Sequence, residues 1–302
     1  MEKLKLGWIG LGAMGTPISK NLLKADYPVT VFNRTRNKEK ELLDAGASSA
    51  DSPRQLMRNC DVIFTMVSDD VAVKAVFEGD QGLLAQAVPG KLIINMSTVS
   101  PETSRYLATI CSEQNVEFLE APVSGSVKQA QDHTLILLVG GEARVFQKAK
   151  PLFEVIGKLV LYFGGIGAGS SAKLSINYLV ALTIQAMAET VLFGVDSGLS
   201  KEDIVALINE SGCASFFTKS KAASILNNSY PAAFALKLMS KDLRLIRQTG
   251  LKSPLFEPVY NSFQQAEKDG LGEEDLMAII KYLKKPNNWN SNYAAAAVAG
   301  NG

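Results

Sequence analysis

A glycine-rich turn near the start of the chain is the feature that most constrains its fold. The stretch LGWIGLGAMGTPISKNLL (residues 6–23) is patterned as a strand, a Gly-x-Gly-x-x-Gly turn and a helix. Glycines in this spacing let a pyrophosphate approach the backbone, where unpaired N–H groups and the helix dipole favour a phosphate. A purely structural turn is the alternative, but the strand–turn–helix context favours a dinucleotide site. The predicted site comprises Gly10, Leu11, Gly12, Ala13, Met14 and Gly15.

The end of the second apolar run indicates which dinucleotide binds. About 20 residues beyond such a turn, an acid usually binds the ribose 2′-hydroxyl. Here Asn33, Arg34 and Thr35 occupy that position. An amide, a guanidinium and a hydroxyl suit a 2′-phosphate dianion, which an acid would repel. We therefore expect NADP(H) rather than NAD(H). The alternative is a solvated surface turn that carries an arginine by chance.

The first half of the chain alternates short β-rich runs with helical patterns. Several runs are apolar throughout, which is typical of strands covered on both faces. Repeated strand–helix units indicate an α/β fold with a parallel, doubly wound sheet, and we assign residues 1–164 to it. The expected strands lie at residues 4–9, 28–32, 61–67, 91–96, 116–120, 135–141 and 158–163, and the helices near 14–25, 36–44, 69–77, 101–114 and 142–156.

The second half of the chain has a different secondary-structure pattern, because strand patterns stop after the GGIGAGS segment at residues 164–170. We expect an all-helical domain over residues 165–286 and a loosely ordered tail over 287–302. Its first helix is long and apolar on more than one face, so we expect it to pack against both domains or a second subunit. The expected helices span residues 170–197, 200–210, 214–226, 239–249, 255–269 and 273–284.

Composition narrows the class of protein. Hydrophobic residues make up 47% and charged residues 20% of the chain, a balance typical of soluble globular proteins. The net charge of +1 gives no electrostatic case for nucleic acid or an anionic membrane. The apolar stretch 176–195 contains Asn177, Gln185 and Glu189, which favours a buried helix over a membrane span. We expect a cytoplasmic protein.

The three cysteines are odd in number, widely spaced and form no CxxC pair. Cys60, Cys111 and Cys213 therefore predict buried thiols in a reducing compartment rather than disulfides or a metal site. The only histidine, His133, lies in a polar loop before a strand, with no second ligand candidate near it in sequence. We expect it at the surface, and we expect no metal.

Lys173 and Asn177 are candidate catalytic residues at the start of the long helix. They lie four residues apart, on one face of the helix. A lysine in an apolar helix is costly to bury unless it is used or paired. Spacing alone favours a surface lysine whose charged end reaches solvent. The functional interpretation therefore needs support from other segments.

Three further segments supply that support. EAPVSGSVKQA (120–130) follows a strand and forms a tight serine turn, INMSTVSPET (94–103) ends a strand, and FALKLMSKDLRL (234–245) places a Lys-Asp pair on a helix. Together with the glycine turn and the Lys173–Asn177 spacing, they resemble the β-hydroxyacid dehydrogenase family over nearly the whole chain. Within it, they are most similar to the NADPH-dependent glyoxylate/succinic semialdehyde reductases.

The resemblance implies an N-terminal Rossmann domain, an all-helical C-terminal domain and NADPH-dependent reduction of a small aldehyde acid to a hydroxy acid. It implies that Lys173 is the catalytic lysine and Asn177 its supporting amide, and that both contact the substrate. Asp242 neighbours the active site in this pattern. The implied substrate-carboxylate turn is Ser124, Gly125 and Ser126, and the implied further cofactor-lining residues are Met66, Val67, Thr98 and Lys241.

Several alternatives stay open at this point. A 3-hydroxyisobutyrate-type dehydrogenase is the nearest other enzyme, and a non-enzymatic NADP-binding protein could use the same fold. The apolar long helix favours a homodimer or homotetramer without deciding between them. Four aromatic residues are candidates to line the pocket and exclude water, although core packing is the favoured role for any one of them: Phe216, Phe217, Tyr230 and Phe234.

Overall fold

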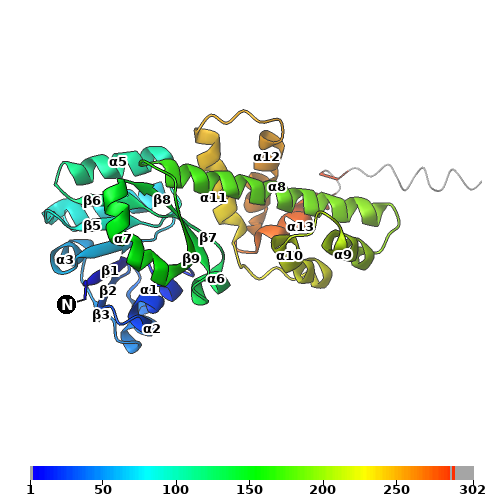
Figure 1. The fold of residues 1–302 in the computed structure, drawn as a ribbon. Helices are drawn as coiled ribbons and strands as arrows, with labels where there is room; N and C mark the ends of the chain where they lie inside the picture. The colour runs from blue at the N-terminus through cyan, green and yellow to red at the C-terminus, as the bar shows by residue number, and fades with distance from the viewer. Residues whose placement is uncertain (1–2, 286–287, 290–302) are drawn as a thin grey trace, which may run out of the picture. The chain divides into compact units, whose positions relative to one another are not determined.

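The protein is described by a computed structural model that covers residues 3–285 and 288–289 (Figure 1). Its contacts divide the chain into two units, Met1–Ser175 and Ile176–Gly302, and the division falls within the long helix α8 (Ala168–Asp196). The domain boundary expected at residues 164 and 165 stays a prediction. Of the tail expected at 287–302, only Asn288 and Trp289 lie among the described residues.

Unit 1 is built on a nine-stranded sheet in the order β3-β2-β1-β4-β5-β6-β8-β7, with β9 paired to β8. The pairs from β3 through β6 are parallel, as expected for a doubly wound fold. The strands are β1 (Leu6–Ile9), β2 (Val29–Phe32), β3 (Ser48–Ser49), β4 (Val62–Thr65), β5 (Leu92–Asn95), β6 (Glu117–Glu120), β7 (Val123–Ser124), β8 (Leu135–Gly141) and β9 (Gly157–Tyr162).

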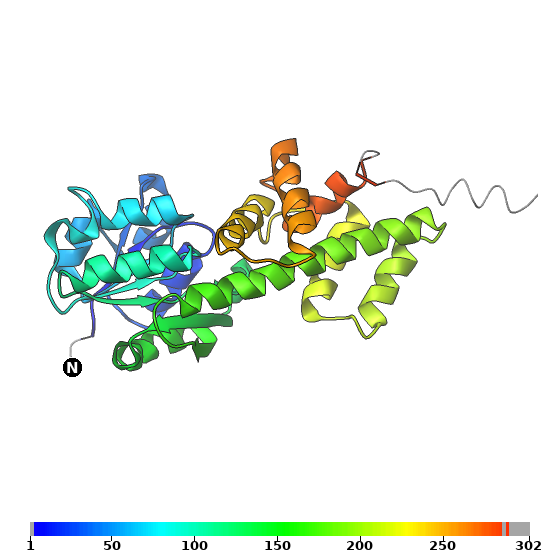
Figure 2. The same ribbon diagram turned by 90° about the horizontal axis from the view of Figure 1, so that it is seen from above.

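Helices cover both faces of this sheet, which explains why its central strands are apolar throughout (Figures 1 and 2). Alternate residues of β4 enter separate cores: Val62 and Phe64 one, Ile63 the other. The first core is covered by α1 (Gly15–Lys24), α2 (Lys40–Asp44), α6 (Val127–Gln131) and α7 (Ala143–Ile156), and the second by α3 (Pro53–Asn59), α4 (Asp70–Phe77) and α5 (Pro101–Ser112).

The sheet differs from the expectation at one edge. β8 runs antiparallel to β6 and β7, and only β9 returns parallel to β8. The connection from β6 to β8 already contains the strand β7, which pairs antiparallel with β8, and its helix α6 has five residues, whereas a parallel crossover usually packs a longer helix against the sheet. The chain therefore turns back at this edge.

Unit 2 is helical, as expected. α11 packs on α12, α12 on α13, and α9 on α10. Its interior holds a buried ion pair between Lys221 and Asp275. The elements after α8 are α9 (Lys201–Glu210), α10 (Phe216–Asn227), α11 (Leu236–Gln248), α12 (Phe256–Ala266), the π turn η3 (Glu267–Leu271), the 3-10 turn η4 (Leu276–Ala278) and α13 (Ile279–Leu283).

Among the described residues, α8 alone is long and apolar enough to cross a membrane by length and composition. A core helix of a soluble protein passes the same test. Asn177 and Gln185 are both buried within it. Its first turn is bound to the sheet of unit 1 through Ser170. These contacts favour a core helix over a membrane span, in line with the expectation.

Candidate active site

The glycine turn lies at the point where the strand order reverses, because β1 pairs with both β2 and β4. In open α/β sheets this is where ligands bind. Gly10 has a positive φ of 98°, and a Cβ there would lie 2.1 Å from the Met66 carbonyl oxygen. A Cβ on Gly15 would lie 2.0 Å from the Gly10 carbonyl oxygen. Glycine is therefore required at both positions to pack the turn.

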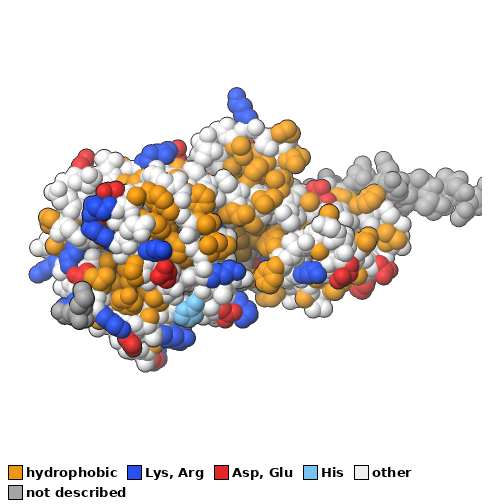
Figure 3. Space-filling model, in the orientation of Figure 1, with side chains coloured by type: hydrophobic (Ala, Val, Ile, Leu, Met, Phe, Trp, Pro, Cys, Tyr) orange, Lys and Arg blue, Asp and Glu red, His pale blue; other side chains and the backbone are white. Residues whose placement is uncertain are grey.

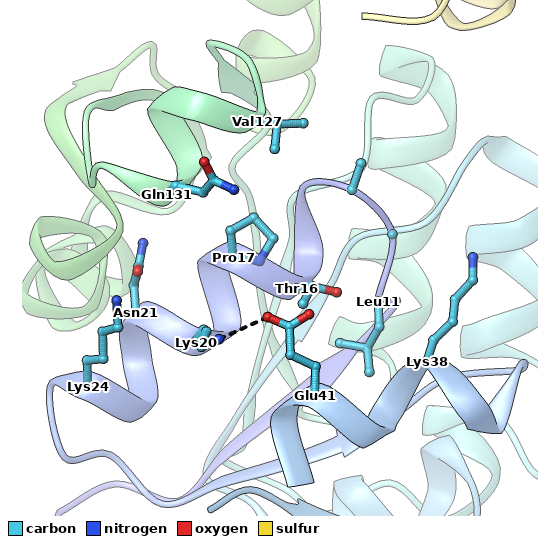
Figure 4. Close-up of a pocket in the computed structure, with 12 residues that line it drawn as sticks. Leu11, Thr16, Pro17, Lys20, Asn21, Lys24, Lys38, Glu41, Val127 and Gln131 are labelled. Atoms are coloured by element: carbon cyan, nitrogen blue, oxygen red, sulfur yellow. Dashed lines mark hydrogen bonds and ion pairs between the residues drawn. The ribbon is translucent and has the colours of Figure 1, made fainter. Parts of the chain in front are cut away.

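Gly12 differs from these two glycines, because a Cβ added there would meet nothing within 4 Å. The space over Gly12 therefore leaves room for a ligand to approach the backbone. Gly12 and Ala13 also line a hollow of about 530 Å³ (Figure 4). The residues present thus fit a dinucleotide pyrophosphate at the start of α1.

Lysines give this hollow a positive character. Lys20, Lys24 and Lys38 line it, against a single acid, Glu41, which Lys20 binds at 2.9 Å (Figure 4). An excess of cations in a hollow attracts anions. The sequence reasoning missed Lys38; its position three residues after Thr35 was the available signal. The remaining lining residues are Leu11, Thr16, Pro17, Asn21, Val127 and Gln131.

Asn33 connects the end of β2 to the glycine turn. Its Oδ1 accepts a hydrogen bond from the Leu11 N–H at 2.9 Å, and its Nδ2 donates to the Thr35 carbonyl at 2.8 Å. Buried Glu39 in turn accepts from the Asn33 N–H at 2.9 Å. The Asn33 amide therefore orders the two predicted cofactor-binding segments relative to each other. Arg34 and Thr35 are exposed.

The carboxyl ends of β4 and β5 are joined by a small polar network. Asn95 Oδ1 accepts from the Thr65 hydroxyl at 2.9 Å and from the Ser97 N–H at 3.1 Å. The Ser97 hydroxyl then accepts from the Val67 N–H at 2.9 Å. This network fixes the backbone at Met66, Val67 and Thr98, three of the predicted cofactor-lining residues. The sequence reasoning missed Thr65 and Asn95, whose only signal was their place at strand ends.

The serine turn follows β7 and begins α6. Ser126 is the N-cap of α6, and Gln129 Oε1 accepts from both its N–H, at 2.9 Å, and its hydroxyl, at 2.5 Å. Ser124 is half-buried and Gly125 is exposed. Because Ser126 is bound to Gln129, Ser124 and Gly125 are the better placed of the three to receive a substrate group.

The long helix α8 buries the two predicted catalytic side chains. Lys173 is 8% exposed and Asn177 is 3% exposed. Spacing alone favoured an exposed lysine, so this burial supports the functional interpretation. Asn177 Nδ2 donates to Asp242 Oδ2 at 2.5 Å, and the Lys241 ammonium lies 2.8 Å from Asp242 Oδ1. Within unit 2, the Lys241–Asp242 pair on α11 therefore fixes the side-chain amide of Asn177 on α8.

The remaining candidates differ in burial. His133 is exposed, as expected, and its Nδ1 lies 3.1 Å from the Val155 carbonyl oxygen. Phe216 is 79% exposed and Tyr230 is buried, while Phe217 and Phe234 are half-buried. Cys60 and Cys111 are buried, as expected. The expectation of burial was wrong for Cys213, which is exposed because it lies in the connection between α9 and α10 rather than in a core.

Comparisons with known proteins agree with this layout. Residues 5–165 match the family described as the NAD binding domain of 6-phosphogluconate dehydrogenase. Residues 167–283 match the family described as NAD-binding of NADP-dependent 3-hydroxyisobutyrate dehydrogenase. Glyoxylate/succinic semialdehyde reductase 1 of Arabidopsis thaliana is 36% identical, over 93% of this chain and 99% of its own. Mitochondrial 3-hydroxyisobutyrate dehydrogenase of Mus musculus is 32% identical, over 94% of this chain and 88% of its own.

A solved structure supports the fold as well. The 3-hydroxyisobutyrate dehydrogenase of Mycobacterium tuberculosis, solved with L-serine, superposes with a TM-score of 0.84 at 27% identity. The match covers 94% of this chain and 100% of that one. Both the Rossmann-type sheet and the helical second half are therefore those of a known group of NAD(P)-binding enzymes.

Proposed function

The chain belongs to the β-hydroxyacid dehydrogenase family, and from that premise we propose that it reduces a small aldehyde acid with NADPH. Glyoxylate and succinic semialdehyde are the candidate substrates. The observation that carries the proposal is the burial of Lys173, one helical turn before Asn177 on an apolar helix. Burial removes this ammonium from bulk solvent, and in such a site a proton donor stabilises the negative charge that develops on a carbonyl oxygen more strongly than it does in water.

The chain's own residues divide the work of the reaction. When bound, NADPH supplies the hydride that adds to the aldehyde carbon. The Lys173 ammonium donates a hydrogen bond to the aldehyde oxygen and gives it a proton as negative charge develops there. Asn177 holds substrate and lysine in register, with its amide oriented by Asp242. Solvent then returns a proton to Lys173.

The serine turn binds the carboxylate of the substrate in this proposal. Ser126 is held by Gln129, so we assign the carboxylate chiefly to the Ser124 hydroxyl and the Gly125 N–H. A carboxylate fixed at one end of the substrate orients the aldehyde carbon at the other, which lowers the entropic part of the barrier.

Preference for NADP(H) rests on the end of β2. Arg34 and Thr35 are exposed beside the glycine turn that Asn33 anchors, and Lys38 lines the adjoining hollow. A guanidinium and an ammonium near one position suit a phosphate dianion. No acid takes the place after β2 that usually binds a ribose 2′-hydroxyl.

A 3-hydroxyisobutyrate-type dehydrogenase is the second candidate, supported by the mouse relative and by the description of the second family. The test is to measure kcat/KM for glyoxylate, succinic semialdehyde and 3-hydroxyisobutyrate with each nicotinamide cofactor. We expect an aldehyde acid with NADPH to exceed 3-hydroxyisobutyrate with either oxidised cofactor at least about tenfold, roughly 1.4 kcal/mol of transition-state stabilisation. The reverse order would favour the second candidate.

We also propose that the chain forms a homodimer or homotetramer. The support is β9, an edge strand that pairs with β8 alone among the described strands and exposes Leu159, Leu161 and Tyr162 by 43%, 38% and 40%. Hydrophobic side chains gather over the region of α7, β8 and β9 in Figure 3. Apolar edge strands usually require cover, and a second copy pairing β9 about a two-fold axis would provide it. A monomer in sedimentation equilibrium would contradict this.

A further inference from the structure

Glu120, the last residue of β6, is a fully buried carboxylate bound to the start of α8. Its Oε1 accepts from the Gly167 N–H at 2.6 Å and the Gly169 N–H at 2.8 Å, and its Oε2 accepts from the Ser170 hydroxyl at 2.5 Å. All of these donors are neutral, and the described residues offer Glu120 no ion-pair partner. The unpaired N–H groups of a helix start and its dipole stabilise the charge instead.

The packing around this carboxylate is close. A Cβ on Gly140 of β8 would lie 2.3 Å from Glu120 Oε1, and a Cβ on Gly169 would lie 2.4 Å from the Leu138 carbonyl oxygen. The Ser170 hydroxyl also lies 2.9 Å from the hydroxyl of Ser104, on α5. The first turn of α8 is therefore pressed against β8 and held from two further elements.

We propose that Glu120 is a positioning residue that sets the place of the Lys173 ammonium by fixing this turn. The inference rests on the proposed function, in which Lys173 is the proton donor. Lys173 follows Ser170 by three residues, about 4.5 Å along the helix axis. Helical side chains lean toward the N-terminus, so the lysine reaches back over the turn that Glu120 holds.

The simpler reading is that Glu120 contributes only to stability. The two readings differ in kinetics, because a misplacement of about 1 Å can lower turnover about 100-fold without weakening binding. A purely structural role would lower the amount of folded enzyme and leave kcat per NADPH-binding site unchanged.

The first experiment compares Glu120→Ala with Glu117→Ala on the same strand, whose carboxylate binds Arg144 and Lys148 near the surface. We expect Glu120→Ala to lower kcat about 100-fold, with KM and the NADPH Kd within about threefold. Glu120→Gln keeps an acceptor for the glycine N–H groups and should recover part of the loss. Glu117→Ala should stay within about twofold of wild type, as expected for a surface ion pair.

If Glu120→Ala does not fold, the variant Ser170→Ala tests the proposal instead. It removes one of the three hydrogen bonds and should lower kcat about threefold to tenfold. Ser171→Ala is the matched control on the same turn, because among the described contacts that hydroxyl bonds only locally, to the Gly167 carbonyl four residues earlier, at 2.8 Å. Equal kcat values for Ser170→Ala and Ser171→Ala would overturn the proposal.

A double-mutant cycle separates positioning from stability. In a Lys173→Ala background, Glu120→Gln should cause no further loss of kcat, because it acts through the lysine. The same fold loss in both backgrounds would overturn the proposal. Hydrogen exchange of the amides at 167–172 gives a readout without substrate and should be faster in Glu120→Gln than in wild type or in Lys173→Ala; unchanged exchange would also overturn the proposal. If the wild-type protein reduces no aldehyde acid but exchange is still faster in Glu120→Gln, the proposed function is wrong, whereas the role of Glu120 in fixing the first turn of α8 is retained.

Discussion

Two buried carboxylates, one in each unit, bind the long helix in different ways. Glu120 in unit 1 accepts from two backbone N–H groups and a hydroxyl at the start of α8. Asp242 in unit 2 accepts from the Asn177 amide and is paired with the Lys241 ammonium. A helix end offers unpaired N–H groups, whereas a helix interior has used its own. A buried acid beside a helix interior therefore depends on side-chain donors.

The largest expected effect concerns Lys173, which lies between Ser170 and Asn177 in sequence, the two α8 side chains that these acids bind. Lys173→Ala should lower kcat about 1000-fold, because both proton donation and stabilisation of the developing alkoxide are lost. NADPH binding, measured by fluorescence titration, should change less than about twofold. Lys237→Ala serves as control, because that half-exposed side chain is paired with Glu273 near the surface. This value sets the upper limit for any variant of Glu120 or Asp242. Retained turnover in Lys173→Ala would contradict the proposed mechanism, and the variant would then set no upper limit on the kcat loss expected for Glu120 or Asp242.

The next effect tests whether Asp242 orients Asn177. Asp242→Asn leaves Lys241 without its counter-charge and should lower kcat about tenfold to 100-fold. It should also lower the free energy of unfolding by about 3 kcal/mol, because one partner of a buried ion pair is lost. Urea denaturation and steady-state kinetics measure the two effects separately.

Asp275→Asn is the matched control in unit 2. Asp275 is paired with buried Lys221 at 2.8 Å and bonds no residue of α8 among the described contacts. We expect a similar loss of about 3 kcal/mol in the free energy of unfolding, with kcat of the folded enzyme unchanged. If Asp242→Asn behaves in the same way, the proposed contrast between catalytic and structural ion pairs in unit 2 is wrong.

Glu120 and Asp242 also show which features of the fold and site could not be predicted from the sequence. The glycine turn and the strand–helix alternation are local patterns, so they predicted the Rossmann sheet correctly. The bonds from Glu120 to α8 join residues separated by 47 to 50 positions. No periodicity encodes such a contact, and the sequence placed Glu120 only at the end of an expected strand and the start of the serine-turn segment. The antiparallel β8 was missed for the same reason, since strand patterns carry no direction.

Asn33 shows a second kind of limit. The sequence placed it correctly after β2, but described its amide only as a possible phosphate donor. Its two bonds, to the Leu11 N–H and the Thr35 carbonyl, depend on the fold bringing the glycine turn beside β2. Residue type and position were predictable, whereas the partner of a side chain was not.

A smaller effect is expected at the exposed end of β2. Arg34→Ala should raise the NADPH Kd about tenfold to 30-fold and leave the NADH Kd within about twofold, because a charge-assisted contact to the 2′-phosphate is lost. Arg58→Ala, at an exposed position on α3, is the control. Equal weakening of both cofactors would show that Arg34 does not contact the 2′-phosphate.

The smallest effect follows from the cysteines, which report on the two units separately. Burial raises the pKa of Cys60 to about 11 and that of Cys111 to about 12, and both lie in a core of unit 1. At about pH 8 these thiols stay protonated and shielded, so a disulfide reagent should titrate one fast thiol per chain. Cys213→Ser should remove that fast phase. In rising urea the two slow thiols should become reactive when unit 1 unfolds. The urea concentration at the midpoint of this change can then be compared with the unfolding midpoint of unit 2 variants such as Asp275→Asn. Two or three fast thiols in the native protein would contradict the packing of the core around Cys60 and Cys111.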